Sequence, residues 1–135
     1  MESMDRSAIL CVDDEAIIVM SLIHELKTNL GERFIYESAM SAREAFQAIE
    51  DLIQEGVEVI LVISDWLMPG IKGDEFLIMV REKYPSIRSI MITGHADDAA
   101  VERVKREAMT CAVLRKPWNT RELIEAVDSC CGTGC

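Results

Sequence analysis

The sequence lacks any hydrophobic run long enough to cross a membrane, because Asp, Glu, Lys or Arg interrupts every apolar stretch. The first six residues also lack the basic region and apolar core of a secretion signal. No internal repeat, low-complexity segment or linker is present. We therefore expect a cytoplasmic, single-domain protein, with an N-terminal extension at 1–6, the domain at 7–129 and a cysteine-containing C-terminal tail at 130–135.

Basic residues are few, with 14 Lys and Arg against 24 Asp and Glu and a formal net charge of −10. Such a chain repels nucleic acids and anionic membranes unless its basic residues are segregated, and here they are scattered along the sequence. We therefore expect neither a nucleic acid nor a membrane among its partners.

Cysteine is present in an odd number, five, which argues against a disulfide framework. Cys11 and Cys111 lie in or beside apolar runs, so we expect both to be small core residues. Cys130, Cys131 and Cys135 form a tail with no histidine close in sequence to complete a metal site. The sequence favours an unstructured, oxidisable tail, and a metal or redox function is the alternative.

Half of the 135 residues are hydrophobic, which is enough for a real core. Apolar runs alternate with helical patterns along the whole chain. This alternation predicts an α/β fold, an open and mostly parallel doubly wound sheet with helices on both faces. The expected strands are 7–12, 34–39, 57–64, 87–93 and 111–115, and the expected helices are 15–29, 41–56, 74–84, 96–109 and 119–128.

Polar side chains stand where the predicted strands end. Asp13 and Asp14 follow the first strand, Asp65 ends the third, Thr93 closes the fourth, and Lys116 follows the fifth. Ligands of open α/β sheets bind outside the carboxyl ends of the strands. We therefore expect these five side chains to converge in one site.

Three carboxylates in one site require a cation. Two unit charges about 4 Å apart repel by roughly 4 kcal/mol at an effective dielectric of 20. Mg²⁺ prefers oxygen ligands and usually keeps several waters, so it suits Asp13, Asp14 and Asp65. With Lys116 beside it, Mg²⁺ would bring the site near neutrality and ready it for a phosphoryl group, which an aspartate carboxylate can accept as a nucleophile.

Four motifs together resemble the receiver domains of two-component response regulators, over a region from about Ala8 to Asp128. They are Cys-Val-Asp-Asp-Glu at 11–15, Ser-Asp-Trp-Leu-Met-Pro-Gly at 64–70, Met-Ile-Thr-Gly at 91–94 and Arg-Lys-Pro-Trp at 115–118. The resemblance implies a flavodoxin-like fold of the chemotaxis-regulator type, with the strand order 2-1-3-4-5. It also implies a phosphorylation-dependent switch rather than a turnover enzyme, catalysing only its own phosphorylation and dephosphorylation.

The resemblance also implies a role for each site residue. Asp65 would accept the phosphoryl group from a sensor histidine kinase or a histidine phosphotransfer protein. Asp14 would bind Mg²⁺ directly, together with Asp65 and the backbone carbonyl of Leu67, and Asp13 would act mostly through water. The fourth helix, fifth strand and fifth helix would form a candidate homodimer face.

Thr93 would hydrogen-bond the phosphoryl group and Lys116 would pair with it, while the bond before Pro117 is often cis in such domains. The chain departs from the common pattern at two positions. Val113 occupies a switch position where many receivers carry an aromatic residue, and Leu67 is apolar where many are polar. His95 occupies another position at which relatives vary and rates are tuned.

Two other functions would use a similar set of residues or a similar topology. A Mg²⁺-dependent phosphohydrolase with an aspartyl-phosphate intermediate would carry a second aspartate as general acid two residues after the nucleophile, where this chain has Leu67. A flavin-binding module of similar topology would need a Ser/Thr/Gly-rich phosphate loop after the first strand. Asp13, Asp14 and Glu15 would repel a phosphate there.

Overall fold

Five parallel strands form one sheet in the computed structural model, which describes residues 6–68, 70–94 and 98–131. The strand order is β2-β1-β3-β4-β5, so the predicted topology is confirmed. The strands are β1 (Ser7–Val12), β2 (Ile35–Ala39), β3 (Glu58–Asp65), β4 (Arg88–Thr93) and β5 (Ala112–Arg115).

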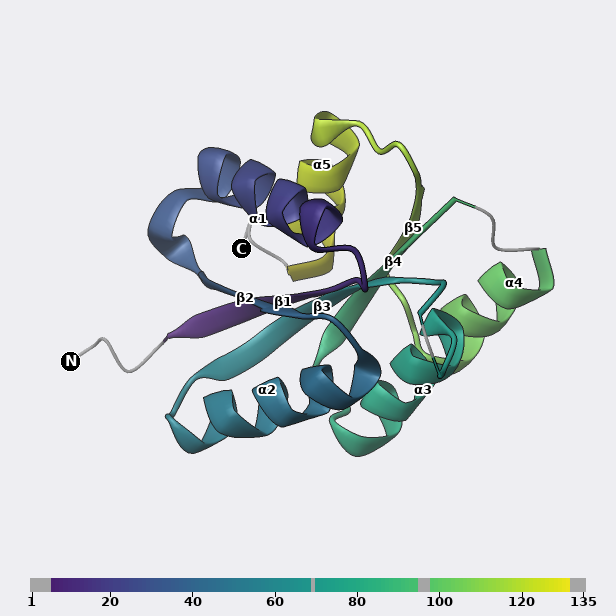
Figure 1. The fold of residues 1–135 in the computed structure, drawn as a ribbon, viewed down its shortest axis with the longest axis horizontal. Coiled ribbons are helices and arrows are strands. Elements are labelled where there is room, and N and C mark those ends of the chain that lie inside the picture. Colours follow the sequence, from purple (N-terminus) through teal and green to yellow (C-terminus); the bar gives the residue numbers. More distant parts are fainter. Residues whose placement is uncertain (1–5, 69, 95–97, 132–135) are drawn as a thin grey trace.

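The helices cover both faces of the sheet, with α1 and α5 on one face and α2, α3 and α4 on the other (Figure 1). A short 3₁₀ turn, η1 (Gly31–Arg33), follows α1. The α-helices are α1 (Ala16–Leu30), α2 (Ala42–Gln54), α3 (Gly73–Lys83), α4 (Asp98–Glu107) and α5 (Thr120–Cys131).

The strand sequences explain why two cores form. Alternate side chains of a strand point to opposite faces, and parallel sheets are buried on both faces. In β3, Val62 therefore packs toward α2 and α3, while Leu61 and Ile63 pack toward α1 and α5. All residues of β3 from Leu61 to Asp65 are buried, as its continuous apolar run predicts. The last of these buried residues is the acidic one.

Side-chain caps fix where two helices begin. The Ser41 hydroxyl accepts the Glu44 N–H at 3.1 Å, and the Glu44 carboxylate accepts the Met40 N–H at 3.0 Å. These two bonds form a capping box in which the reciprocal bond goes to the residue before the cap. At α5, the Asn119 side-chain oxygen accepts the Arg121 N–H at 2.8 Å and so caps the helix.

The C-terminal cysteines differ from expectation. Helix α5 continues through Cys131, so the prediction that Cys130 and Cys131 lie in an unstructured tail is wrong. No breaker stands between Asp128 and Gly132, so the helix continues and buries Cys130. Cys111 is exposed and disulfide-bonded to Cys130, which contradicts its assignment to the core. Cys11 is fully buried, as expected, and Cys135 lies outside the described residues.

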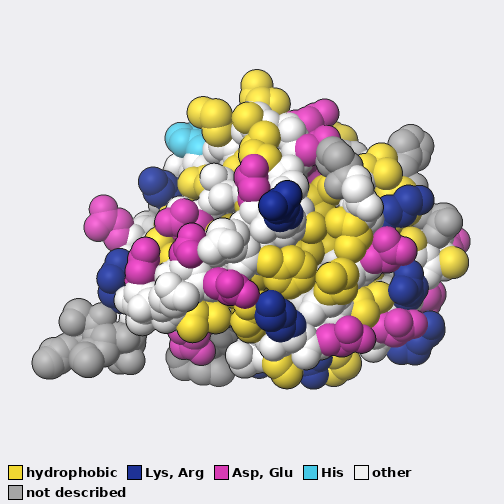
Figure 2. Space-filling model, turned by 60° about the horizontal axis from the view of Figure 1, so that its bottom comes forward, with side chains coloured by type: hydrophobic (Ala, Val, Ile, Leu, Met, Phe, Trp, Pro, Cys, Tyr) yellow, Lys and Arg dark blue, Asp and Glu magenta, His cyan; other side chains and the backbone are white. Residues whose placement is uncertain are grey.

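The surface carries charges of both signs. On the face shown in Figure 2, Lys and Arg side chains are interspersed with acidic ones rather than gathered into one region. Among the described residues, no helix combines the length and the hydrophobicity needed to span a membrane.

Candidate functional site

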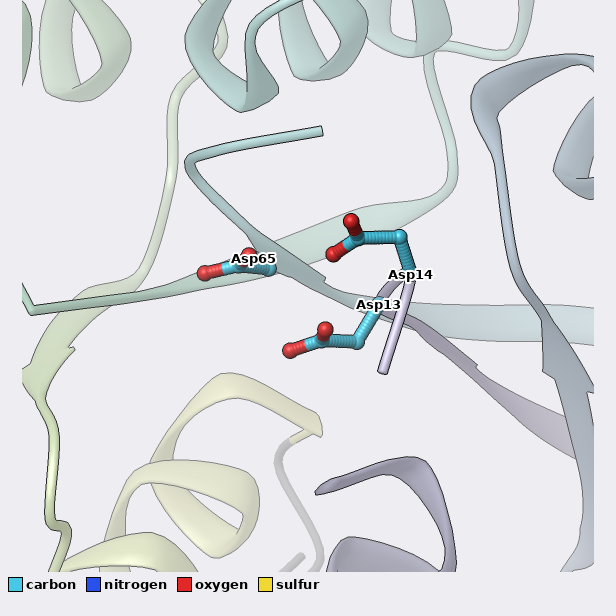
Figure 3. Close-up of side chains that lie close together, drawn as sticks. All are labelled: Asp13, Asp14 and Asp65. Atoms are coloured by element: carbon cyan, nitrogen blue, oxygen red, sulfur yellow. The ribbon is translucent and has the colours of Figure 1, made fainter. Parts of the chain in front are cut away.

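The predicted acidic residues meet at the carboxyl ends of β1 and β3. Asp13, Asp14 and Asp65 each place one carboxylate oxygen so that all three oxygens lie within 4.8 Å of one another. Figure 3 shows that the carboxylates of Asp13 and Asp14 extend toward the side on which Asp65 lies. Residues that are 51 or more positions apart in the sequence therefore form one cluster because β1 and β3 are parallel neighbours.

The two adjacent aspartates have different environments. Asp13 is only 2% exposed, and its carboxylate accepts the Glu15 N–H at 2.9 Å and a bond from Lys116 at 3.2 Å. Asp14 is exposed. Consecutive residues leave a strand end in different directions, so one aspartate is held by the protein and the other faces solvent.

Lys116 joins the cluster from the end of β5. Its Nζ lies 3.1 Å from Asp65 Oδ1 and 3.2 Å from Asp13 Oδ2, and its side chain is 25% exposed. The Lys116 N–H donates to the Thr93 carbonyl at 2.8 Å, which aligns the ends of β4 and β5. Thr93 is buried at the end of β4. The Lys116–Pro117 peptide bond is cis, as expected from the sequence.

Burial and charge act in opposite directions at this cluster. Desolvation raises the pKa of Asp13 and of Asp65, and Lys116 lowers both without cancelling the rise. For Lys116, burial disfavours the charged form, but its contacts with Asp65 and Asp13 outweigh burial and raise its pKa. The site thus holds buried carboxylates whose ionised forms lack sufficient compensating positive charge.

The donor set fits a magnesium ion. All three aspartates offer the hard oxygen ligands that Mg²⁺ prefers, and ligands on opposite sides of Mg²⁺ lie about 4 Å apart. A cluster of this size accommodates one ion that also keeps water ligands. The described residues that would hold the ion are Asp13, Asp14 and Asp65.

Gly73 is a residue that the sequence analysis did not identify. Its N–H donates to the Trp66 carbonyl at 2.6 Å, and a Cβ at this position would collide with the backbone carbonyl of Asp65. The start of α3 therefore packs directly against the strand end that carries Asp65. Only a tertiary contact imposes this glycine, so local sequence contains no signal for it.

Asp74 is a second residue that the sequence analysis missed. It is buried, accepts the Trp66 indole N–H at 3.2 Å and pairs with Arg103 of α4 at 3.5 Å. In sequence it reads as an ordinary acidic residue in the first turn of a helix. In the structure it links the loop after Asp65 to α4, across a cleft of about 600 Å³ that Trp66, Asp74 and Arg103 help to line.

The remaining predicted positions lie around the cluster. Leu67 is 53% exposed, and Val113 is partly buried against the core of α2, α3 and α4. The Trp118 indole N–H donates to the Glu25 carboxylate of α1 at 2.9 Å, so it connects the segment just before α5 to α1. His95 lies outside the described residues.

We predict that Asp65→Asn raises the stability of the metal-free protein at neutral pH. Because burial raises the folded-state pKa of Asp65 above its ordinary value of 3.8, ionisation of Asp65 costs folding free energy. That cost is absent below pH 3.8 and complete above the raised folded-state pKa. The free energy of unfolding in EDTA should therefore be larger for Asp65→Asn than for wild type at pH 7, and the difference should shrink toward pH 4.

The matched control is Asp51→Asn, which removes an aspartate from the exposed face of α2. Because this side chain is exposed, its replacement should change the free energy of unfolding little. Denaturant unfolding at both pH values measures the effect, and an Asp65→Asn protein that is less stable than wild type at pH 7 would contradict the prediction.

The sequence matches the family model of the response regulator receiver domain over residues 9–128. It is 36% identical over 122 residues to the hydrogenase transcriptional regulatory protein HoxA of Cupriavidus necator, and this match covers 90% of the chain. The chain spans only 23% of the length of that relative. A chemotaxis protein CheY homolog of Campylobacter jejuni is 28% identical over 127 residues, which cover 93% of each sequence.

A solved structure shares the fold. The signal receiver domain of an HD domain-containing protein from Pseudomonas fluorescens superposes with a TM-score of 0.82 and 29% sequence identity. The superposition covers 95% of this chain and 96% of that one.

Proposed function

The chain belongs to the response regulator receiver domain family, and we propose that Asp65 is the residue that accepts the phosphoryl group. Receiver domains of two-component systems are switch domains. The observation that carries the proposal is the position of Asp65. It ends the central strand, lies next to Lys116 and forms one carboxylate cluster with Asp13 and Asp14.

The proposed reaction is an in-line displacement at phosphorus. A carboxylate oxygen of Asp65 forms the new bond to phosphorus, and the bond from phosphorus to the imidazole nitrogen of a phosphohistidine breaks. The histidine belongs to a sensor kinase or a histidine phosphotransfer protein, and the proposed setting is the cytoplasm. When bound, Mg²⁺ would neutralise phosphoryl oxygens during transfer.

Three side chains around Asp65 have separate proposed roles in phosphoryl transfer. Lys116 already lies 3.1 Å from Asp65, so its charge is in place for the incoming phosphoryl oxygens. Asp13 positions Lys116 through the 3.2 Å ion pair. Thr93 ends the strand next to β3, from which its hydroxyl can hydrogen-bond the phosphoryl group.

A turnover phosphohydrolase is the second candidate, and the structure offers no acid at the position where such an enzyme would need one. Leu67 is exposed and apolar at that position. The deciding experiment incubates the protein with Mg²⁺ and acetyl phosphate and follows intact mass. We expect one phosphoryl group per chain and none in EDTA, whereas repeated hydrolysis of phosphate monoesters would favour the phosphohydrolase.

We propose that the switch acts mainly through α4. Asp74 links Trp66, the residue after Asp65, to Arg103 of α4, so a change at Asp65 has a direct route to that helix. Val113 cannot supply the alternative route of a swinging aromatic side chain, because its short branched side chain has one stiff torsion. The new charge would bias a local two-state shift of α4.

We therefore predict where amide chemical shifts change when beryllofluoride, a stand-in for the phosphoryl group, is added. Beyond the site itself, the largest changes should fall between Thr93 and Val101, a segment that includes residues 95–97 outside the described structure. Asp74→Asn should reduce those changes, because it weakens the pairing with Arg103. Changes of equal size around Val113 would contradict the prediction. The face formed by α4, β5 and α5 remains our proposed homodimer surface.

A further inference from the structure

The Cys111–Cys130 disulfide lies at the end of the sheet opposite the carboxylate cluster. It joins the residue just before β5 to the last turn of α5, with a Cα–Cα distance of 5.5 Å. The covalent loop that it closes runs through β5 and contains Lys116. The bridge therefore restrains the segment that contains Lys116. The bridge itself lies far from the carboxylate cluster.

The two bridged cysteines differ in their exposure to solvent. Cys130 is 2% exposed, whereas Cys111 is exposed and lines a cleft of about 350 Å³. Two arginines, Arg81 and Arg88, also line this cleft, and its described lining contains no acidic residue. Thiol–disulfide exchange needs an attacking thiolate to reach one sulfur, so access selects Cys111. The arginines favour an attacking thiol that carries carboxylates.

The surrounding structure provides partners for both redox states. Cys130 Sγ lies 3.9 Å from the Ser89 carbonyl, which can accept a hydrogen bond from the thiol once the bridge opens. Arg88 donates to the Cys130 carbonyl at 3.1 Å, and the Cys111 N–H donates to the Ser89 carbonyl at 2.9 Å. These bonds hold the end of α5 and the start of β5 on β4 without the disulfide. Opening the bridge therefore does not require unfolding.

The other described cysteines are poor competitors for exchange. Burial raises the pKa of the Cys11 thiol to about 12, and burial also raises the pKa of Cys131. Exchange requires a thiolate, so neither residue is a ready internal attacker at neutral pH. Among the described residues, no free cysteine is therefore a ready reductant of the bridge, and we consider a thiol from outside the chain.

We propose that Cys111–Cys130 is a reversible thiol–disulfide exchange site for an anionic low-molecular-weight thiol of the glutathione class. One thiolate attacks Cys111 Sγ, the sulfur–sulfur bond breaks, and Cys130 leaves as a thiolate that takes up a proton. A second thiolate attacks the sulfur of the bound small thiol and releases Cys111. Two small thiols are thereby oxidised to one small disulfide, and the protein gains two thiols. In a reducing compartment such bridges are mostly transient, which suits a site that reports redox state.

The first test equilibrates the wild-type chain in buffers of different oxidised-to-reduced glutathione ratio, quenches with acid, alkylates and maps the labelled peptides. We expect Cys111 and Cys130 to gain label together as the buffer becomes reducing, while the fold persists by circular dichroism. A different pairing in the oxidised protein would overturn the proposal. So would free Cys111 and Cys130 at every ratio, or reduction at a rate that does not depend on thiol concentration.

The second test uses two paired variants that trap the exchange intermediate. With oxidised glutathione, Cys130→Ser should gain one glutathione on the accessible Cys111, while Cys111→Ser should gain none on the buried Cys130. The reverse pattern would overturn the assignment of Cys111 as the attacked sulfur. If a variant does not fold, the wild-type protein provides the same test. Acid quenching early in the reduction of the wild-type protein should trap glutathione on Cys111.

The third test concerns the cleft. Arg81→Gln should slow reduction by glutathione several-fold without slowing reduction by neutral 2-mercaptoethanol, because only the anionic thiol uses the charge. Arg121→Gln is the matched control, since Arg121 is exposed on α5 and is not part of the cleft lining. Equal effects of Arg81→Gln on both thiols would refute selection of an anionic thiol.

Discussion

Asp65→Asn is expected to abolish the phosphoryl adduct that acetyl phosphate and Mg²⁺ form on this chain. The carboxylate oxygen of Asp65 is the proposed nucleophile, and an amide oxygen cannot take over a covalent bond to phosphorus of comparable stability. We expect labelling to fall by more than about a hundredfold, as is common when a nucleophile is removed. Intact mass spectrometry measures the adduct directly.

Other aspartates serve as controls for this loss. Asp51→Asn, on the exposed face of α2, should label like wild type. Asp13→Asn and Asp14→Asn should label more slowly but still on Asp65, because they weaken the surroundings and not the nucleophile. A full-sized adduct on Asp65→Asn, mapped to Asp13 or Asp14, would refute the assignment.

The stability of Asp65→Asn shows whether its loss of labelling comes from the missing nucleophile or from misfolding. Asp65→Asn is expected to be at least as stable as wild type without metal, because burial raises the pKa of Asp65 and its ionised form is costly. Loss of labelling in a protein of unchanged or higher stability therefore cannot be attributed to misfolding. The two measurements together identify Asp65 as a residue retained at the expense of stability.

The site was predictable from sequence because the strands of the sheet are parallel. Each apolar run that ends in a polar residue marks a strand end, and parallel strands bring their carboxyl ends to one edge. Asp13, Asp65 and Lys116 thus met as expected, within 3.2 Å for each contact of Lys116. The pattern needed no information about contacts between helices.

Features that depend on contacts between distant elements were not predictable in this way. Gly73 is required because the backbone of Asp65 lies against it, and Asp74 matters because Arg103 reaches it from α4. Neither contact follows from periodicity. The pairing of Cys111 with Cys130 was missed for a related reason, since it needed the end of α5 to extend past Asp128 and lie beside β5.

The difference between the adjacent aspartates leads to a prediction about the metal. Asp13 is buried, and its two oxygens already accept the Glu15 N–H and the Lys116 ammonium, whereas Asp14 is exposed beside them. A carboxylate engaged by protein donors is better placed to act on Mg²⁺ through a water ligand, and an exposed carboxylate can bind the ion directly. Removing the direct ligand should therefore weaken binding more than removing the indirect one.

We expect Asp13→Asn to weaken Mg²⁺ binding by about tenfold, as for a residue that acts through another ligand, and Asp14→Asn to weaken it several times further. Tryptophan fluorescence should report the titration, since Trp66 follows Asp65 in the chain, and Asp51→Asn controls for the loss of one negative charge.

Asp13→Asn should also loosen Lys116, which keeps only its 3.1 Å contact with Asp65, so phosphorylation of this variant should remain slow even at saturating Mg²⁺. Asp14→Asn should instead recover much of its rate when Mg²⁺ is raised, because its defect is in affinity. Equal affinities for the two variants, or recovery of both at high Mg²⁺, would show that the adjacent aspartates share one role.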